Sequence, residues 1–150
     1  MRFCFDMRFP RLLLVEDDLA SIFALRQFFA ISGYEVDCAA GPVEGLRLLN
    51  RYAYDAVITD LHLRPAESDG MRIAGYARFR NPRACVVMLT ANGSPEVEAE
   101  ARRFGVDLYH VKPVDLARLS ASIARVIVLH NPDVPPVPED ALSDLEGQGA

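Results

Sequence analysis

The sequence predicts an α/β fold in which parallel strands alternate with helices. Five short apolar runs begin near residues 11, 35, 56, 84 and 107, and the segments between them have the spacing of amphipathic helices. Three of the runs are apolar throughout, which is typical of strands covered on both faces. This alternation favours a parallel sheet with right-handed crossovers, and 150 residues are enough for one such domain.

The five strands follow from the apolar runs. The first, third and fourth runs lack the polar alternation of a half-exposed strand, so we expect them inside the sheet. In the second run Val36 and Cys38 alternate with Glu35 and Asp37, which predicts an edge strand. The expected strands are residues 12–15, 35–38, 56–59, 85–89 and 108–111.

The five helices follow from apolar residues at helical spacing. Gly33 ends the first expected helix, and Pro42 suits the start of the second. The later helices are expected at residues 70–79, 95–104 and 116–127. The apolar face predicted for the first helix consists of Leu19, Ile22, Phe23 and Phe29. The face predicted for the second consists of Val43, Leu46, Leu49 and Tyr52.

The charge balance argues against direct binding to nucleic acid or membrane. Residues 131–150 hold five acids and no Lys or Arg, so residues 1–130 hold the other sixteen of the 21 acids and all sixteen basic residues. A neutral body lacks the basic face that nucleic acids require. The cluster of Arg78, Arg80 and Arg83 is interpreted as a solvated helix end. No apolar stretch approaches the roughly 18–20 residues of a membrane span.

The chain divides into three segments. We expect a lead-in over residues 1–10, a folded domain over 11–130, and a disordered, proline-rich acidic tail over 131–150, with a linker as the alternative for the tail. The three cysteines lack the spacing of metal ligands, and Cys85 is expected as a small buried hydrophobe. This cysteine usage is typical of a reducing compartment, so we expect a cytoplasmic protein.

Polar side chains follow four of the expected strands. Glu16 and Asp17 follow the first, Asp60 the third, Thr90 the fourth, and Lys112 the fifth. The carboxyl ends of parallel strands meet at one edge, where open α/β sheets bind ligands. The last of these residues is also the only lysine in the chain. We therefore expect the five side chains to converge.

Carboxylates gathered at one edge require a compensating charge. Two carboxylates about 4 Å apart repel by roughly 4 kcal/mol at an effective dielectric constant near 20. A proton or a divalent cation relieves this repulsion, and Mg²⁺ suits an all-oxygen site. A lone carboxylate beside a metal, here Asp60, is arranged to attack phosphorus. Thr90 and Lys112 would then stabilise the phosphoryl oxygens.

The ordered set V-E-D-D, T-D-L, L-T-A and V-K-P resembles the receiver domain of two-component response regulators, over residues 11–130. The resemblance implies a flavodoxin-like, doubly wound sheet of five parallel strands in the order 2-1-3-4-5, with helices on both faces. It implies that Asp60 accepts a phosphoryl group. It also implies that Glu16, Asp17, Asp60 and the backbone carbonyl of His62 hold Mg²⁺.

The resemblance further implies a conformational switch. Thr90 resembles the switch hydroxyl of the family and Lys112 its phosphate-contacting lysine, and Tyr109 falls where the family often has an aromatic that changes rotamer on activation. A cis peptide bond is expected before Pro113. Simpler alternatives remain open: Thr90 as an ordinary strand-end hydroxyl, Tyr109 as packing only, and Asp18 as a cap for the first helix.

The resemblance implies a signalling domain rather than an enzyme, with only self-phosphorylation and slow self-dephosphorylation. The donor would be the phosphohistidine of a sensor histidine kinase or histidine phosphotransfer protein. The output would be contact with a downstream protein, and a phosphorylation-dependent homodimer is compatible with this. One alternative is an Mg²⁺-dependent phosphohydrolase with Asp60 as nucleophile, although such enzymes have a second acidic residue at the position where this chain has His62. The other is a non-phosphorylated pseudo-receiver that serves as an interaction module.

One departure from the family pattern concerns the loop after the acceptor. From Asp60 to Gly70 the chain is two residues longer than usual, with Leu63 in place of a methionine and Arg64 inserted before Pro65. This predicts a more mobile loop or an added contact.

Overall fold

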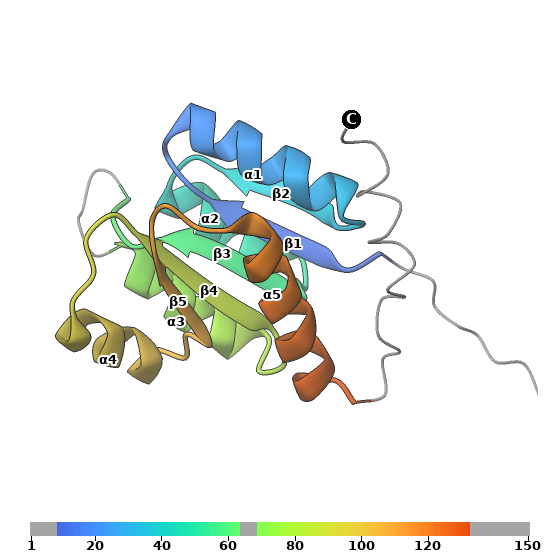
Figure 1. The fold of residues 1–150 in the computed structure, drawn as a ribbon. Helices are drawn as coiled ribbons and strands as arrows, with labels where there is room; N and C mark the ends of the chain where they lie inside the picture. The colour runs from blue at the N-terminus through green and yellow to red at the C-terminus, as the bar shows by residue number, and fades with distance from the viewer. Residues whose placement is uncertain (1–8, 64–68, 133–150) are drawn as a thin grey trace, which may run out of the picture.

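The computed structural model describes residues 9–63 and 69–132. They form one parallel five-stranded sheet in the order β2-β1-β3-β4-β5, as Figure 1 shows. The predicted fold class, strand order and edge position of the second strand are therefore confirmed. The strands are β1 (Arg11–Val15), β2 (Glu35–Ala39), β3 (Ala56–Asp60), β4 (Cys85–Thr90) and β5 (Leu108–Val111).

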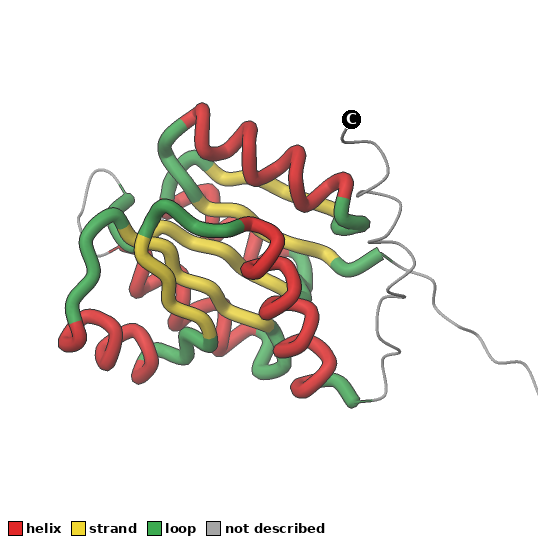
Figure 2. The backbone as a smooth tube through the Cα atoms, in the orientation of Figure 1, coloured by secondary structure: helices red, strands yellow, loops and turns green. Residues whose placement is uncertain are grey.

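Helices cover both faces of the sheet. Figures 1 and 2 show α1 and α5 on the side nearer the viewer and α2 and α3 behind the strands. Their bounds are α1 (Leu19–Ile31), α2 (Pro42–Arg51), α3 (Asp69–Arg80), α4 (Pro95–Arg103) and α5 (Leu116–His130). None of the helices in residues 9–63 and 69–132 is both long enough and apolar enough to cross a membrane.

The sheet separates two apolar cores, and the alternation of side chains along each strand fills both. Leu12 and Leu14 of β1 pack with Phe29 of α1 and Ile123 of α5. Leu13, one residue away, belongs to the opposite core beneath α2 and α3. Because the central strands supply both cores, nearly every residue in them is buried, which explains their continuous apolar runs.

The predicted apolar face of the first helix is partly wrong. Leu19 and Phe23 are 77% and 70% exposed, whereas Leu25 and Phe29 are the buried residues of α1. The segment is apolar on most of its circumference, so periodicity does not select one face. Val43, predicted inside with Leu49, is likewise exposed at the start of α2.

Side-chain and backbone signals fix the helix ends. Asp18 is the N-cap of α1 and accepts a hydrogen bond from the Ser21 backbone N–H at 3.0 Å, which confirms the capping alternative. After α1 and α4, Gly33 and Gly105 adopt φ angles of +98° and +97°, which favour glycine. The Lys112-Pro113 peptide bond is cis, as expected.

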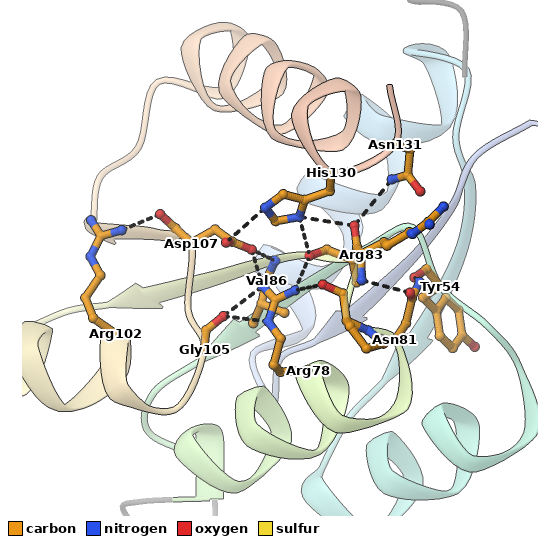
Figure 3. Close-up of polar contacts among 12 residues, drawn as sticks. Tyr54, Arg78, Asn81, Arg83, Val86, Arg102, Gly105, Asp107, His130 and Asn131 are labelled. Atoms are coloured by element: carbon orange, nitrogen blue, oxygen red, sulfur yellow. Dashed lines mark hydrogen bonds and ion pairs between the residues drawn. The ribbon is translucent and has the colours of Figure 1, made fainter. Parts of the chain in front are cut away.

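The interpretation of Arg78 as part of a solvated helix end is wrong. Its guanidinium is mostly buried and donates to the backbone carbonyls of Pro82 at 2.7 Å, Ala84 at 2.8 Å and Gly105 at 2.9 Å, and it pairs with Asp107 (Figure 3). The planar, five-donor fork of arginine suits several carbonyls at once, which composition alone does not reveal. Arg78 thus joins the end of α3 to the segments that precede β4 and β5.

The end of α5 joins the same network. The His130 ring places Nδ1 3.2 Å from the carbonyl oxygens of Arg83 and Ala84, and Nε2 3.7 Å from an Asp107 carboxylate oxygen (Figure 3). Asp107 also accepts a hydrogen bond from the Val86 N–H at 2.9 Å. Polar contacts therefore close the amino-terminal edge of the sheet, opposite the edge where the predicted site lies.

Replacing Arg78 with methionine should lower the free energy of unfolding by about 2–4 kcal/mol. The substitution leaves buried carbonyls and the Asp107 carboxylate without their donor. Urea denaturation at neutral pH measures the change. Arg83→Ala is the control because that side chain is exposed, and it should change stability by less than about 0.5 kcal/mol. Equal effects of the two substitutions would contradict the structural role of Arg78.

Candidate functional site

Two strands place buried carboxylates next to each other. Asp60 is the last residue of β3, and Glu16 directly follows β1, its neighbour in the sheet. The Glu16 backbone N–H donates to the carbonyl of Ala39 at 3.1 Å, so the chain still follows the sheet at this position. The Glu16 side chain is only 2% exposed, and Asp60 is also buried. Both acids are thus held on backbone that has little freedom to move.

Asp17 completes an acidic cluster. One carboxylate oxygen from each of Glu16, Asp17 and Asp60 lies within 4.8 Å of the other two. The structure therefore brings together the three side chains predicted to hold a metal ion. Three oxygen ligands at this spacing match the preference of a hard cation such as Mg²⁺.

Lys112 connects two of these acids. Its Nζ lies 3.0 Å from Oε2 of Glu16 and 2.9 Å from Oδ2 of Asp60. Its backbone N–H donates to the carbonyl of Thr90 at 2.8 Å, which holds the residue at the end of β5 beside β4. Burial alone would lower the pKa of Lys112, but hydrogen bonds to the two carboxylates raise it above its ordinary value. The lysine is therefore firmly protonated.

The charge of Glu16 is only partly compensated. Burial raises the pKa of Glu16 above its ordinary value, while hydrogen bonds from Lys112 and from the Asp18 N–H, at 3.1 Å, oppose this shift. The negative charge of Asp60 adds to the increase. A site that disfavours its own carboxylate charge is one that a further cation would stabilise.

Thr90 lies at the same edge, but its hydroxyl serves the following loop. Thr90 Oγ1 is buried, donates to the carbonyl of Asn92 at 3.0 Å and accepts from the Asn92 N–H at 3.2 Å. These contacts hold the loop after β4 in place. Thr90 as a ligand of a phosphoryl group stays a prediction.

Tyr109 lies beneath the same loop. Its hydroxyl is buried and has no hydrogen-bond partner among the described residues. A Cβ atom added to Gly93 would come within 3.0 Å of this hydroxyl, so the loop backbone packs directly on the ring. Both predicted switch residues, Thr90 and Tyr109, thus contact residues 91–93, and their role in switching stays a prediction.

His62 contributes through its backbone. Its N–H donates to Oδ1 of Asp60 at 3.2 Å, which orients the carboxylate, while its side chain is exposed. The predicted metal contact of the His62 carbonyl stays a prediction. Leu63 is buried, whereas the inserted Arg64 and Pro65 lie outside the described residues.

Gly70 supports the site and was missed as a functional residue in the sequence. A Cβ atom at this position would lie 2.1 Å from the carbonyl oxygen of Asp60 and 2.6 Å from the Cα of Leu61. The Gly70 N–H also donates to the carbonyl of Leu61 at 3.2 Å. The start of α3 therefore packs directly against the backbone of the predicted acceptor. The Asp69-Gly70 pair at the end of the loop was the signal that could have revealed this.

A family model for the response regulator receiver domain matches residues 12–124 of the chain. Among the similar curated proteins is the transcriptional regulatory protein GlrR of Escherichia coli, which is 39% identical over 112 residues. That match covers 75% of this chain and 25% of the relative, so the chain spans about a quarter of the length of the curated relatives it matches.

Solved structures agree with the family match. A CheY-like response regulator receiver domain protein from Methanospirillum hungatei has a TM-score of 0.78 at 27% identity, over 84% of this chain and 99% of that one. The receiver domain of a sensor histidine kinase from Pseudomonas aeruginosa has a TM-score of 0.69 at 26% identity, over 80% and 98% of the two chains. That structure is described with a magnesium ion coordinated in its active site cleft.

Gly70→Ala should destabilise the protein by about 2 kcal/mol or more, because the added methyl group would contact rigid backbone. Urea denaturation gives the change. Gly75→Ala in the same helix is the matched control: its Cβ would meet only the Phe104 side chain, at 3.1 Å, and that ring is partly exposed and free to shift. Gly70→Ala with wild-type stability would show that α3 does not pack on the acceptor in this way.

Proposed function

The chain belongs to the response regulator receiver domain family, and on this premise we propose that Asp60 accepts a phosphoryl group from a phosphohistidine. The observation that carries the proposal is the position of the Lys112 ammonium, within 3.0 Å of both Glu16 and Asp60. A lone lysine held among buried carboxylates is a ready partner for phosphoryl oxygens. The phosphohydrolase and pseudo-receiver alternatives are not favoured by the family match.

In the proposed step, a carboxylate oxygen of Asp60 attacks the phosphorus atom of the donor. The bond between phosphorus and the histidine ring nitrogen breaks, and its electron pair leaves with the imidazole, which takes a proton from water. The product is an acyl phosphate on Asp60. Lys112 would exchange its contact with the Asp60 carboxylate for a contact with a phosphoryl oxygen. The Thr90 hydroxyl would leave its partners in the loop and donate to a second phosphoryl oxygen.

We infer that Glu16, Asp17 and Asp60, with the carbonyl of His62, hold Mg²⁺ for this reaction. The donor set fits, because three carboxylate oxygens lie within 4.8 Å of one another, and burial raises the pKa of Glu16, so a cation would favour its charged form. When bound, the ion screens the negative charge of the incoming phosphoryl oxygens. The magnesium described in the similar P. aeruginosa receiver supports this assignment.

The phosphodonor is proposed to be a sensor histidine kinase or a histidine phosphotransfer protein. Leu19 and Phe23 support a protein donor, because they are large exposed apolar residues of α1, which begins two residues after Asp17. Exposed apolar side chains beside a reactive site are typical of protein interfaces. The donor would thus dock on α1 while its histidine enters the acidic cluster.

The output is proposed to pass through the loop after β4. Phosphoryl contact with Thr90 would release the hydroxyl bonds to Asn92, and Tyr109 beneath the loop would respond. A changed surface on α4, β5 and α5 would then contact a downstream protein. The name of GlrR, a transcriptional regulatory protein, supports a role in transcriptional control for a longer protein that contains this domain. Homodimerisation on phosphorylation stays a prediction.

Acetyl phosphate or a phosphorylated kinase, with Mg²⁺, should add one phosphoryl group to the wild type and none to Asp60→Asn. Mass spectrometry of the intact chain measures the addition. Asp115→Asn, a carboxylate exposed at the start of α5, is the control and should be modified like the wild type. Modification that persists in Asp60→Asn would refute the acceptor assignment. Repeated turnover of a small phosphoester would favour the hydrolase.

Mg²⁺ should raise the melting temperature of the wild type. At ten times the dissociation constant, binding adds about 1.4 kcal/mol of stability. For a domain of this size, this amounts to roughly 3–5 °C. Asp17→Asn removes one ligand and should lose most of the shift, whereas Glu96→Gln, which neutralises an exposed acid on α4, should retain it. Differential scanning fluorimetry with and without EDTA measures the melting temperatures. A wild-type increase with Mg²⁺ in Asp17→Asn would mean that the ion binds elsewhere.

A further inference from the structure

An open groove of about 780 Å³ lies between α2 and α3. Here it is named the α2–α3 groove. It lies on the face of the sheet opposite α1 and α5, and it contains none of the residues assigned to phosphoryl transfer. The residues that carry the argument are Val43, Leu46 and Arg47 on α2 and Arg72, Tyr76 and Phe79 on α3.

The lining residues repeat at helical spacing on both helices. On α2 they occupy positions 43, 46, 47 and 50, and on α3 positions 72, 75, 76 and 79. Each set is an i, i+3, i+4, i+7 stripe, the pattern by which a helix normally contacts another helix. Two parallel stripes with open space between them form a seat for a third helix.

Hydrogen bonds join the two helices that form the groove. The Tyr76 hydroxyl donates to the side-chain oxygen of Asn50 at 3.0 Å, and Arg80 donates to the backbone carbonyls of Leu49 and Asn50 at 3.2 and 3.0 Å. These bonds fix α3 to the end of α2. A partner would therefore bind without first ordering the surface, which lowers the entropic cost of association.

The groove leaves large apolar side chains in water. Val43 is 71% exposed and Phe79 77% exposed, and the Phe79 ring stacks on Tyr76 at 6.2 Å between centroids. Phe104, after α4, also lines the groove, with its ring beside Gly75. Large apolar side chains exposed along one groove are typical of protein interaction sites.

Charge indicates which partner fits. Arg47 and Arg72 are exposed in the lining, one on each helix, and the ion pair of Arg72 with Asp69 is loose, at 3.8 Å. A second copy of the chain docked symmetrically would bring these arginines against their counterparts, which like-charge repulsion disfavours. An acidic partner would be attracted to both.

We propose that the α2–α3 groove binds an amphipathic helix of another protein, with an apolar face in the groove and acidic residues against Arg47 and Arg72. The occupant enters as a helix because the two stripes match helical spacing. Its acidic residues are inferred from the one exposed arginine that each helix contributes to the lining. This interaction is independent of phosphoryl transfer to Asp60.

The test uses two synthetic peptides about 18 residues long, five helical turns. Both carry leucine at the i, i+3, i+4, i+7 positions; one has glutamate on both flanks of that face and the other has lysine. Fluorescence anisotropy with the full chain measures binding. The glutamate peptide should bind the wild type. The double variant Arg47→Glu/Arg72→Glu should bind the glutamate peptide about tenfold or more weakly than the wild type does. It should bind the lysine peptide about tenfold more tightly than the wild type does.

Two further variants separate charge from packing. Phe79→Ser should weaken binding of the glutamate peptide, although this substitution changes no charge. Arg118→Glu/Arg125→Glu reverses two exposed arginines on α5, across the sheet, and should leave binding unchanged. Circular dichroism verifies that each variant folds. If the α5 variant lost as much affinity for the glutamate peptide as the Arg47→Glu/Arg72→Glu variant, net charge alone would explain both losses, and the proposal would be overturned.

Other occupants give different results. Failure of the glutamate peptide to saturate the wild type overturns the proposal. Concentration-dependent self-association that Phe79→Ser abolishes would assign the groove to a second copy, again contrary to the proposal. Tighter peptide binding by Leu142→Ser/Leu145→Ser would assign it to the acidic segment of this chain's own residues 133–150, which also overturns a partner in trans.

Discussion

The ammonium group of Lys112, held between Glu16 and Asp60, is the interaction on which the site depends. Two buried carboxylates on adjacent strands repel each other strongly in a poorly solvated environment. The lysine reaches them from β5, across β4, so its single charge joins three strands that are not all neighbours. Burial keeps the pKa of Glu16 raised, although the hydrogen bond from the lysine opposes this shift. A further cation beside these carboxylates would favour the charged form of Glu16.

The two edges of the sheet differ in how their charged groups are compensated. At the amino-terminal edge, Arg78, Asp107 and His130 satisfy one another and the nearby carbonyls. At the carboxyl-terminal edge, carboxylate oxygens of Glu16, Asp17 and Asp60 lie within 4.8 Å of one another. Stability and reactivity are thereby assigned to different ends of the same strands. Substitutions at one edge need not disturb the other, since strands of four to six residues separate the two.

The strands and the site edge were predictable because both depend on local sequence. Buried central strands require unbroken apolar runs, and Asp60 and Lys112 directly follow two of them. The exposed position of Phe23 was not predictable, because α1 is apolar on most sides and only the placement of α5 and β2 decides which side is covered. Arg78 and Gly70 were misread or missed for a related reason. Their partners, Gly105 and Leu61, come close only after the chain has folded.

Tyr109 places a buried hydroxyl group beneath the loop after β4 at an energetic cost. A hydroxyl buried without a partner among the described residues forfeits about 1–3 kcal/mol relative to a hydrated one. Any rearrangement of the 91–93 loop that lets water reach this oxygen recovers that free energy. The packing of the 91–93 loop over this oxygen therefore carries a free-energy cost that other contacts of the domain must offset.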